Sequence, residues 1–167
     1  MNIDSREFSQ QAYKALHDLR GHLHDLAAEV IKKEKEERRL PNARPSEKEV
    51  NERTKSYCEK SSSLVQGLST YIAAWGLHRL TGDAKKFSIG MASDTKYKGK
   101  VYGLFLERLK YLSKEEFVIW SHGYDASDEK TLVNMELRKY TALNRLAMQL
   151  AKEWGFWATA ILGEAKE

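Results

Sequence analysis

Apolar side chains recur every three or four positions over the first part of the chain, which is the spacing of one face of an α-helix. The stripe consists of Phe8, Ala12, Leu16, Leu19, Leu23, Leu26 and Val30. Asp4 and Glu7 have the spacing of an N-terminal capping box, and Pro41 ends the pattern. The sequence therefore predicts a long amphipathic helix that ends at about Leu40.

A second helical region follows the linker between Pro41 and Pro45. Ser46 and Glu49 form another capping-box pair at its start. Its apolar side consists of Val50, Tyr57, Leu64, Leu68, Tyr71, Ile72 and Trp75. We expect a break or bend at the three serines 61–63, because serine side chains compete for backbone hydrogen bonds. Beyond them, a strip of small residues predicts the close approach of another helix: Ser63, Gly67, Thr70 and Ala74.

Helical spacing is lost between about residues 82 and 100, a stretch with three glycines and five lysines. Its length and lack of periodicity predict a flexible connection. The helical pattern resumes at Val101, a short helix is expected from Ser113 to Trp120, and a final helix from about Thr131 to Leu162. With no sustained strand-like alternation, the sequence predicts one all-α domain, residues 1–167. We expect a compact bundle of five to six helices with a long N-terminal and a long C-terminal helix.

Composition sets the broad class of protein. The formal net charge is +4 and the isoelectric point is near 9.0, which permits a nucleic-acid partner without requiring one. The single cysteine, Cys58, cannot form an internal disulfide, so we expect a reducing, cytoplasmic location. The polar first residues lack the apolar segment of a signal peptide, and no uncharged window is long enough to span a membrane.

Two His-Asp pairs lie one heptad apart in the first helix, His17-Asp18 and His24-Asp25. Metal-dependent helical phosphohydrolases use such pairs because imidazole and carboxylate together hold divalent cations. Those enzymes need further ligands from other helices, and the sequence offers no clear set of them. No phosphate-binding glycine loop, paired cysteines or nucleophile elbow is present either. We therefore expect no metal, no cofactor and no catalytic residue, and interpret both pairs as a solvated helix flank.

Charge and aromatic side chains coincide in the segment from 83 to 100. It contains five lysines against two aspartates, and Phe87 and Tyr97 are interleaved with them. The lysines are Lys85, Lys86, Lys96, Lys98 and Lys100. Cations next to aromatic rings suit the phosphates and exposed bases of a single strand, so these lysines are the candidate RNA-binding residues. An ordinary solvated loop is the alternative interpretation.

The last helix has apolar side chains on more than one side. Trp154, Phe156, Trp157 and Leu162 are the residues that widen its apolar surface. A helix end of this kind is buried either in the core of its own chain or in a contact with another subunit. We take these four residues as candidate subunit contacts and leave core burial as the alternative.

Four segments together resemble the small subunit of the Cmr (type III-B) CRISPR effector complex. They are AYKALHDLR near the start, KSYCEKSSSLVQGLSTYIAAW, YGLFLERLKYL, and LNRLAMQLAKEWGFWATAIL near the end. The second segment is built around the pair Gly67-Leu68. The fourth has Arg145, Ala147, Leu150, Trp157 and Ala158 at places that match the family. Gln66 and the serines 61–63 depart from the family pattern, which usually has asparagine before the Gly-Leu pair.

The resemblance implies a helical bundle without catalytic residues. Small subunits of this family stack on copies of themselves as an inner filament of an antiviral complex. They lie beside the backbone subunits that carry the crRNA and help to hold the target RNA against this guide. The expected partners are therefore the other effector subunits, crRNA, target RNA and further copies of the chain, with no membrane.

Three other functions stay open at the level of sequence. The first is the small subunit of the Csm-type (type III-A) complex, which is easily confused with that of the Cmr type. A helical metal-dependent phosphohydrolase would use the His17-Asp18 and His24-Asp25 pairs. A helical scaffold or regulator would not bind nucleic acid at all.

Overall fold

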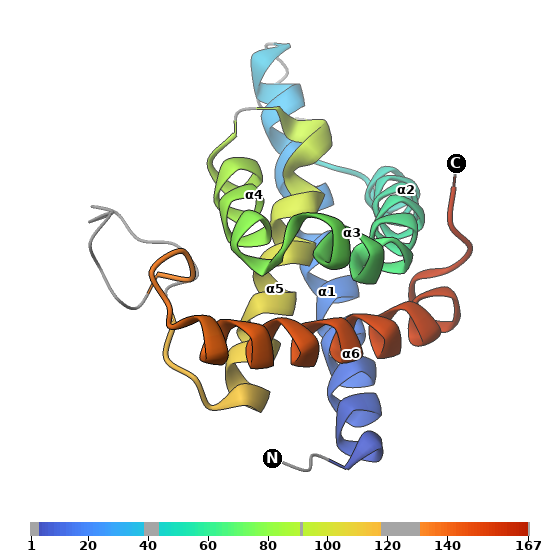
Figure 1. Ribbon diagram of the computed structural model, residues 1–167. Coiled ribbons are helices and arrows are strands. Elements are labelled where there is room, and N and C mark those ends of the chain that lie inside the picture. Colours follow the sequence, from blue (N-terminus) through green and yellow to red (C-terminus); the bar gives the residue numbers. More distant parts are fainter. Residues whose placement is uncertain (1–3, 39–43, 91, 118–130, 167) are drawn as a thin grey trace.

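The computed structural model describes residues 4–38, 44–90, 92–117 and 131–166. Six α-helices and one short 3-10 helix make up the secondary structure of these residues, which contain no strand. They are α1 (Ser5–Glu37), α2 (Glu47–Gln66), α3 (Leu68–Trp75), α4 (Leu77–Ile89), η1 (Ser93–Thr95), α5 (Lys96–Ser113) and α6 (Leu137–Leu162). The predicted all-α bundle with a long first and a long last helix is confirmed (Figure 1). No helix in the described ranges is long and apolar enough to cross a bilayer.

Two helices run side by side through the molecule, α1 and α5, and α6 crosses both of them (Figure 1). Around this frame, α2 packs against α1 and α6, α3 packs against α6, and α4 packs against α5. The predicted stripe of α1 lies in the core, where Leu16, Leu19 and Leu23 are fully buried. Phe105 of α5 meets Trp154 of α6 edge to face, with ring centroids 5.2 Å apart. The core thus lies where α1, α5 and α6 meet.

Both predicted helix starts are confirmed, although of the two predicted capping boxes only that of Ser46 and Glu49 is formed. An Asp4 carboxylate oxygen accepts a hydrogen bond from the backbone N–H of Arg6 at 2.9 Å and caps α1. At α2, Ser46 and Glu49 form a complete capping box. The Ser46 hydroxyl accepts from the Glu49 N–H at 3.3 Å, and the Glu49 carboxylate accepts from the Ser46 N–H at 2.8 Å. These bonds satisfy backbone donors that a helix start leaves without partners.

The predicted break at residues 61–63 is wrong. The α2 helix continues to Gln66 and the chain bends at Gly67 instead. Ser61 and Ser62 are fully buried, so their small side chains serve helix packing rather than a turn. The strip of small residues is also misassigned, since Ser63, Gly67, Thr70 and Ala74 are all exposed. A shift of one or two positions along a helix turns a side chain from the core towards solvent.

The largest difference concerns the connection expected over residues 82–100. Most of this range is helical, because α4 continues to Ile89 and α5 begins at Lys96. The apolar side of α4 consists of Leu77, Leu80 and Ala84, which are buried at helical spacing. The final helix begins at Leu137 rather than Thr131. Residues 114–117 are not helical, and the rest of the short helix expected up to residue 120 lies outside the described residues.

Candidate functional site

The α4 and α5 helices form a tight hairpin that determines where the candidate lysines lie. Gly99 of α5 contacts the backbone of α4 directly. A β-carbon at this position would lie 2.8 Å from the Ser88 nitrogen and 3.0 Å from the Phe87 carbonyl carbon. Glycine is therefore required here for close approach, and the two helices hold their side chains in a fixed relation to each other.

The hairpin separates the five candidate lysines into groups. Lys85 and Lys86 belong to α4, and Lys96, Lys98 and Lys100 belong to α5. Because successive helical residues are rotated by about 100°, Lys98 lies on the opposite side of α5 from Lys96 and Lys100. The five lysines therefore do not form one continuous strip, as an irregular loop would have allowed.

One group surrounds an aromatic ring. The ammonium group of Lys86 lies 5.3 Å from the centre of the Phe87 ring, and that of Lys98 lies 5.1 Å from the same ring. Both distances are in the range of cation–π attraction. Phe87 also packs against Tyr102 of α5, with ring centroids 6.2 Å apart. We call Lys86, Phe87 and Lys98 the hairpin surface.

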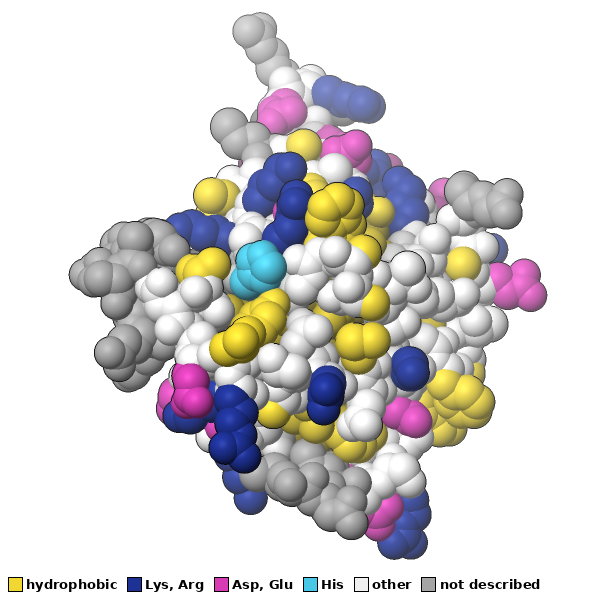
Figure 2. All heavy atoms as spheres, in the orientation of Figure 1, with side chains coloured by type: hydrophobic (Ala, Val, Ile, Leu, Met, Phe, Trp, Pro, Cys, Tyr) yellow, Lys and Arg dark blue, Asp and Glu magenta, His cyan; other side chains and the backbone are white. Residues whose placement is uncertain are grey.

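The surroundings of the hairpin surface are rich in cations and apolar groups. Figure 2 shows Lys and Arg side chains next to hydrophobic ones over α4 and the start of α5. A second cation–aromatic pair joins the end of α3 to the start of α4, where the Arg79 guanidinium lies 4.6 Å from the centre of the Trp75 ring. Trp75 is exposed. Cations thus lie beside the exposed ring of Trp75 and the half-buried ring of Phe87.

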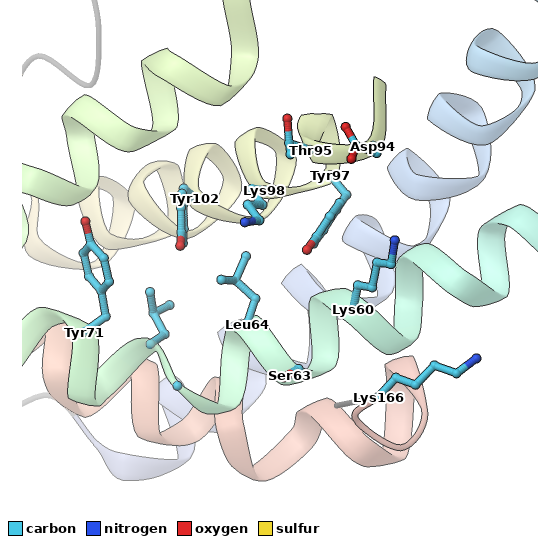
Figure 3. Close-up of a pocket in the computed structure, with 12 residues that line it drawn as sticks. Lys60, Ser63, Leu64, Tyr71, Asp94, Thr95, Tyr97, Lys98, Tyr102 and Lys166 are labelled. Carbon is cyan, nitrogen blue, oxygen red and sulfur yellow. The ribbon is translucent and has the colours of Figure 1, made fainter. Parts of the chain in front are cut away.

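A pocket of about 560 Å³ opens next to the hairpin surface, between α2, α3 and α5. Figure 3 shows Tyr97, Lys98 and Tyr102 extending from α5 towards Leu64 and Lys60 on α2. Tyr71, Ser63, Gly67, Leu68, Asp94, Thr95 and Lys166 complete the lining. We call it the tyrosine pocket, and Lys98 belongs to both it and the hairpin surface.

The tyrosines of this pocket keep their protons. Burial raises the pKa of Tyr102 to about 12, and it also raises the pKa of Tyr97. The pKa of Tyr71 is raised by burial and by its hydrogen bond to the Asp83 carboxylate, which is 2.5 Å long. The phenol groups are therefore neutral at physiological pH, and those of Tyr97 and Tyr102 can donate hydrogen bonds to a ligand.

The second group of lysines faces α1. A hydrogen bond from Lys33, 2.7 Å long, and the positive charges of Lys33, Lys96 and Lys100 lower the pKa of Glu29. Three cations thus share one carboxylate on this side of the hairpin. Their charge is partly neutralised within the chain, so this group is the weaker candidate for phosphate binding.

The four candidate subunit contacts have different positions. Trp154 and Leu162 are buried in the core of the chain itself, which is the alternative that the sequence left open for them. Trp157 is half-buried, and its indole N–H donates to the Ser9 hydroxyl at 3.1 Å. Phe156 is 73% exposed and packs edge to face on Trp157. Of the four, Phe156 is the most exposed, and Trp157 is in part accessible beside it.

The His-Asp pairs do not assemble into a metal site. Asp18 forms an ion pair with Arg108 of α5 at 2.7 Å. His17 and His24 line a separate pocket whose charged lining residues are the cations Arg20 and Lys55. Such cations oppose the binding of a metal ion. Among the residues that the structure describes, no group of three histidine, cysteine, aspartate or glutamate side chains could hold a metal.

Sequence reasoning missed several residues of this face, namely Lys60, Tyr71, Trp75, Arg79 and Lys166. They come from α2, α3, α4 and the tail after α6, so no local pattern in the sequence connects them. The sequence held a signal only for α4, the helix that contains Arg79. Leu77, Leu80, Ala84 and Phe87 follow one another at helical intervals, and this spacing could have predicted the helix.

Comparisons of the chain with known protein families, with curated proteins and with solved structures found no match.

Proposed function

We propose that this chain binds single-stranded RNA as a helical, non-catalytic subunit of an RNA-guided effector of the Cmr (type III-B) kind. The resemblance of four sequence segments to the Cmr small subunit supports the kind of assembly. The hairpin surface and the tyrosine pocket beside it support RNA as the partner.

The observation that carries the proposal is the placement of Phe87 between two lysine ammonium groups, at 5.3 and 5.1 Å from its ring. Neither Lys86 nor Lys98 forms an ion pair within the described part of the chain. Their charges are therefore open to the phosphates of a strand. Phe87 is half-buried, and the part of its ring that stays exposed between the two cations offers a nucleobase a stacking surface. These contacts are independent of sequence, which agrees with a complex in which base pairing to a guide reads the target.

Self-assembly is the second part of the proposal. Phe156 exposes a large apolar side chain on α6, and Tyr13 of α1 is also exposed next to Trp157. Tyr13 and Trp157 meet edge to face with ring centroids 5.4 Å apart. An exposed aromatic cluster of this kind suits a contact with another copy of the chain or with a neighbouring effector subunit.

The test of RNA binding is the double variant Lys86→Gln/Lys98→Gln. Each lysine that neutralises a phosphate of a single strand contributes about 0.7 to the slope of log affinity against log salt. We therefore expect the double variant to bind a uridine decamer more weakly and with a slope reduced by about 1.4. Fluorescence anisotropy over a series of salt concentrations measures both quantities.

The matched control is Lys14→Gln/Lys152→Gln, which removes the same charge from exposed positions on α1 and α6. This control should keep the wild-type slope. Equal slopes for both double variants would rule out the hairpin surface as the RNA contact. Absence of decamer binding by the wild-type chain would instead favour a helical scaffold.

A further inference from the structure

The tyrosine pocket contains polar groups that the chain itself does not satisfy. Tyr97 and Tyr102 are 8% and 4% exposed, and their hydroxyl groups point from α5 into the pocket (Figure 3). Within the described residues neither hydroxyl has a hydrogen-bond partner, whereas the Tyr71 hydroxyl donates to Asp83 and the Tyr57 hydroxyl donates to the Ser93 carbonyl. Neither hydroxyl oxygen is among the described buried polar atoms that lack a partner, which are Ser61 Oγ, Arg108 Nε and Trp154 Nε1. Both hydroxyls therefore open into the pocket, where they can donate hydrogen bonds to a ligand.

The charge of the pocket favours an anion. Lys60, Lys98 and Lys166 line it, and among the described residues of its lining Asp94 is the one carboxylate. Lys166 is paired with Glu59 outside the lining at 3.1 Å. Lys60 and Lys98 form no ion pair among the described residues, so two cations remain for a ligand.

The size of the pocket separates one class of anion from others. A volume of about 560 Å³ exceeds what a single phosphate group occupies and leaves room for an attached sugar and base. The walls combine apolar ring edges from the tyrosines with the side chain of Leu64. A ligand with an anionic end and a larger planar body fits this arrangement better than a bare inorganic ion.

Building on the proposed function, we infer that the tyrosine pocket receives one nucleoside phosphate of the bound RNA strand. Lys60 and Lys98 supply the positive charge for its phosphate, and the hydroxyls of Tyr97 and Tyr102 are donors for oxygen atoms of the nucleotide. Lys98 belongs to both the pocket and the hairpin surface, so a strand that crosses Phe87 passes directly to the pocket entrance. The pocket fixes one nucleotide, and the hairpin surface carries its neighbours.

The experiment fills the pocket without changing the hairpin surface. Ser63 is exposed at the pocket wall, so Ser63→Trp places a large ring in the cavity and leaves the core intact. Ala73→Trp is the matched control, because Ala73 is exposed on α3 outside the pocket lining. Tyr97→Phe/Tyr102→Phe removes the two hydroxyls and keeps the rings. Binding of a uridine decamer and of free uridine monophosphate is measured for each variant by anisotropy and calorimetry.

We expect Ser63→Trp to weaken decamer binding at least about tenfold, and each lost hydroxyl to weaken it about two- to tenfold. Ala73→Trp should bind like the wild type. Circular dichroism and thermal melting verify that every variant is folded.

Two results would overturn the inference. In the first, Ser63→Trp and the double phenylalanine variant both bind the decamer as tightly as the wild type, while Lys86→Gln/Lys98→Gln binds it more weakly. This result would show that the pocket does not bind the RNA, and it would agree with the proposed function. Binding of free uridine monophosphate that Ser63→Trp abolishes, without any binding of the decamer, would assign the pocket to a free nucleotide and contradict the RNA function as well.

Discussion

Gly99 lies where the backbones of α4 and α5 come into contact. Its missing side chain brings α5 close enough for Lys98 to reach the ring of Phe87, at 5.1 Å. The neighbouring Gly103, one turn later on the same helix, has no atom within 4 Å of the position of an added β-carbon. Gly99 is therefore needed for the close packing of α4 on α5, whereas Gly103 is not.

We predict that Gly99→Ala destabilises the protein by about 1–3 kcal/mol, because the new methyl group would meet backbone atoms of α4 that cannot move independently. Gly103→Ala should stabilise it by up to about 1 kcal/mol, since alanine favours helix and the site has room. Urea denaturation of both variants measures the free energy of unfolding. A stabilised Gly99→Ala would mean that the close approach of the two helices is not required.

The candidate site could be predicted from the sequence only in part. The coincidence of lysines with Phe87 and Tyr97 between residues 83 and 100 pointed to the part of the chain that contains Lys86, Phe87 and Lys98 of the hairpin surface. It could not separate Lys98 from Lys100, because an irregular loop was expected and only a helix places them on opposite sides. Lys60 could not be predicted as a site residue either, because only the tertiary fold brings α2 next to α5 at the pocket.

At the scale of elements, one carboxylate connects the start of α2 to the end of α1. An oxygen of Glu49 accepts hydrogen bonds from the Ser46 N–H, the Ser46 hydroxyl and the Lys35 ammonium group, each 2.8 Å long. Lys35 also donates to the Arg44 carbonyl at 3.2 Å. The capping box is therefore also a link between two helices.

The bonds to Lys35 and Ser46 lower the pKa of Glu49 from 4.5 to about 2. A carboxylate whose pKa is lower in the folded state stabilises the fold above pH 4.5 and loses this contribution as the pH falls towards 2. We therefore predict that Glu49→Gln is less stable than the wild type at pH 7, and that the difference shrinks between pH 4.5 and 2. Thermal melting at several pH values measures it.

Glu52→Gln is the control for this prediction, because Glu52 is exposed on the same helix and forms no ion pair among the described residues. It should change stability by less than Glu49→Gln at pH 7. A difference between Glu49→Gln and wild type that stays constant from pH 7 to pH 2 would show that the carboxylate charge contributes nothing to the link.

Elements with long apolar stripes could be predicted from the sequence, as α1 and α6 show. The α4 helix was missed because Gly82, Gly90 and several lysines interrupt a short stripe of three buried residues. Gly82 is accommodated because it faces open space, with no atom near the position of an added β-carbon. Short helices gain most of their stability from tertiary packing, here against α5, and sequence periodicity alone does not report this packing.

At the scale of the whole molecule, Trp154 and Phe156 allow the fold to be tested separately from the proposed self-assembly. Trp154 is fully buried against Phe105, whereas Phe156 is 73% exposed. We predict that Trp154→Ala destabilises the monomer by about 3–5 kcal/mol. Phe156→Ser should change its stability by no more than about 0.5 kcal/mol, while weakening self-association. Urea denaturation measures the stability of both variants, and sedimentation velocity measures self-association.

Unchanged sedimentation at all concentrations for both wild type and Phe156→Ser would contradict a role of Phe156 in self-association.

The crossing of α6 over α1 has a consequence for synthesis of the protein. α6 follows every other helix in the chain, yet it packs against α1, α2 and α3 and supplies Trp154 to the core. On the ribosome, the α4–α5 hairpin can form as soon as its own residues emerge, because its contacts are local. The apolar faces of α1, α2 and α3 that pack against α6 remain exposed to solvent at least until residue 162 has been translated. A nascent chain stalled before that point would be a natural client for chaperones that bind exposed apolar segments.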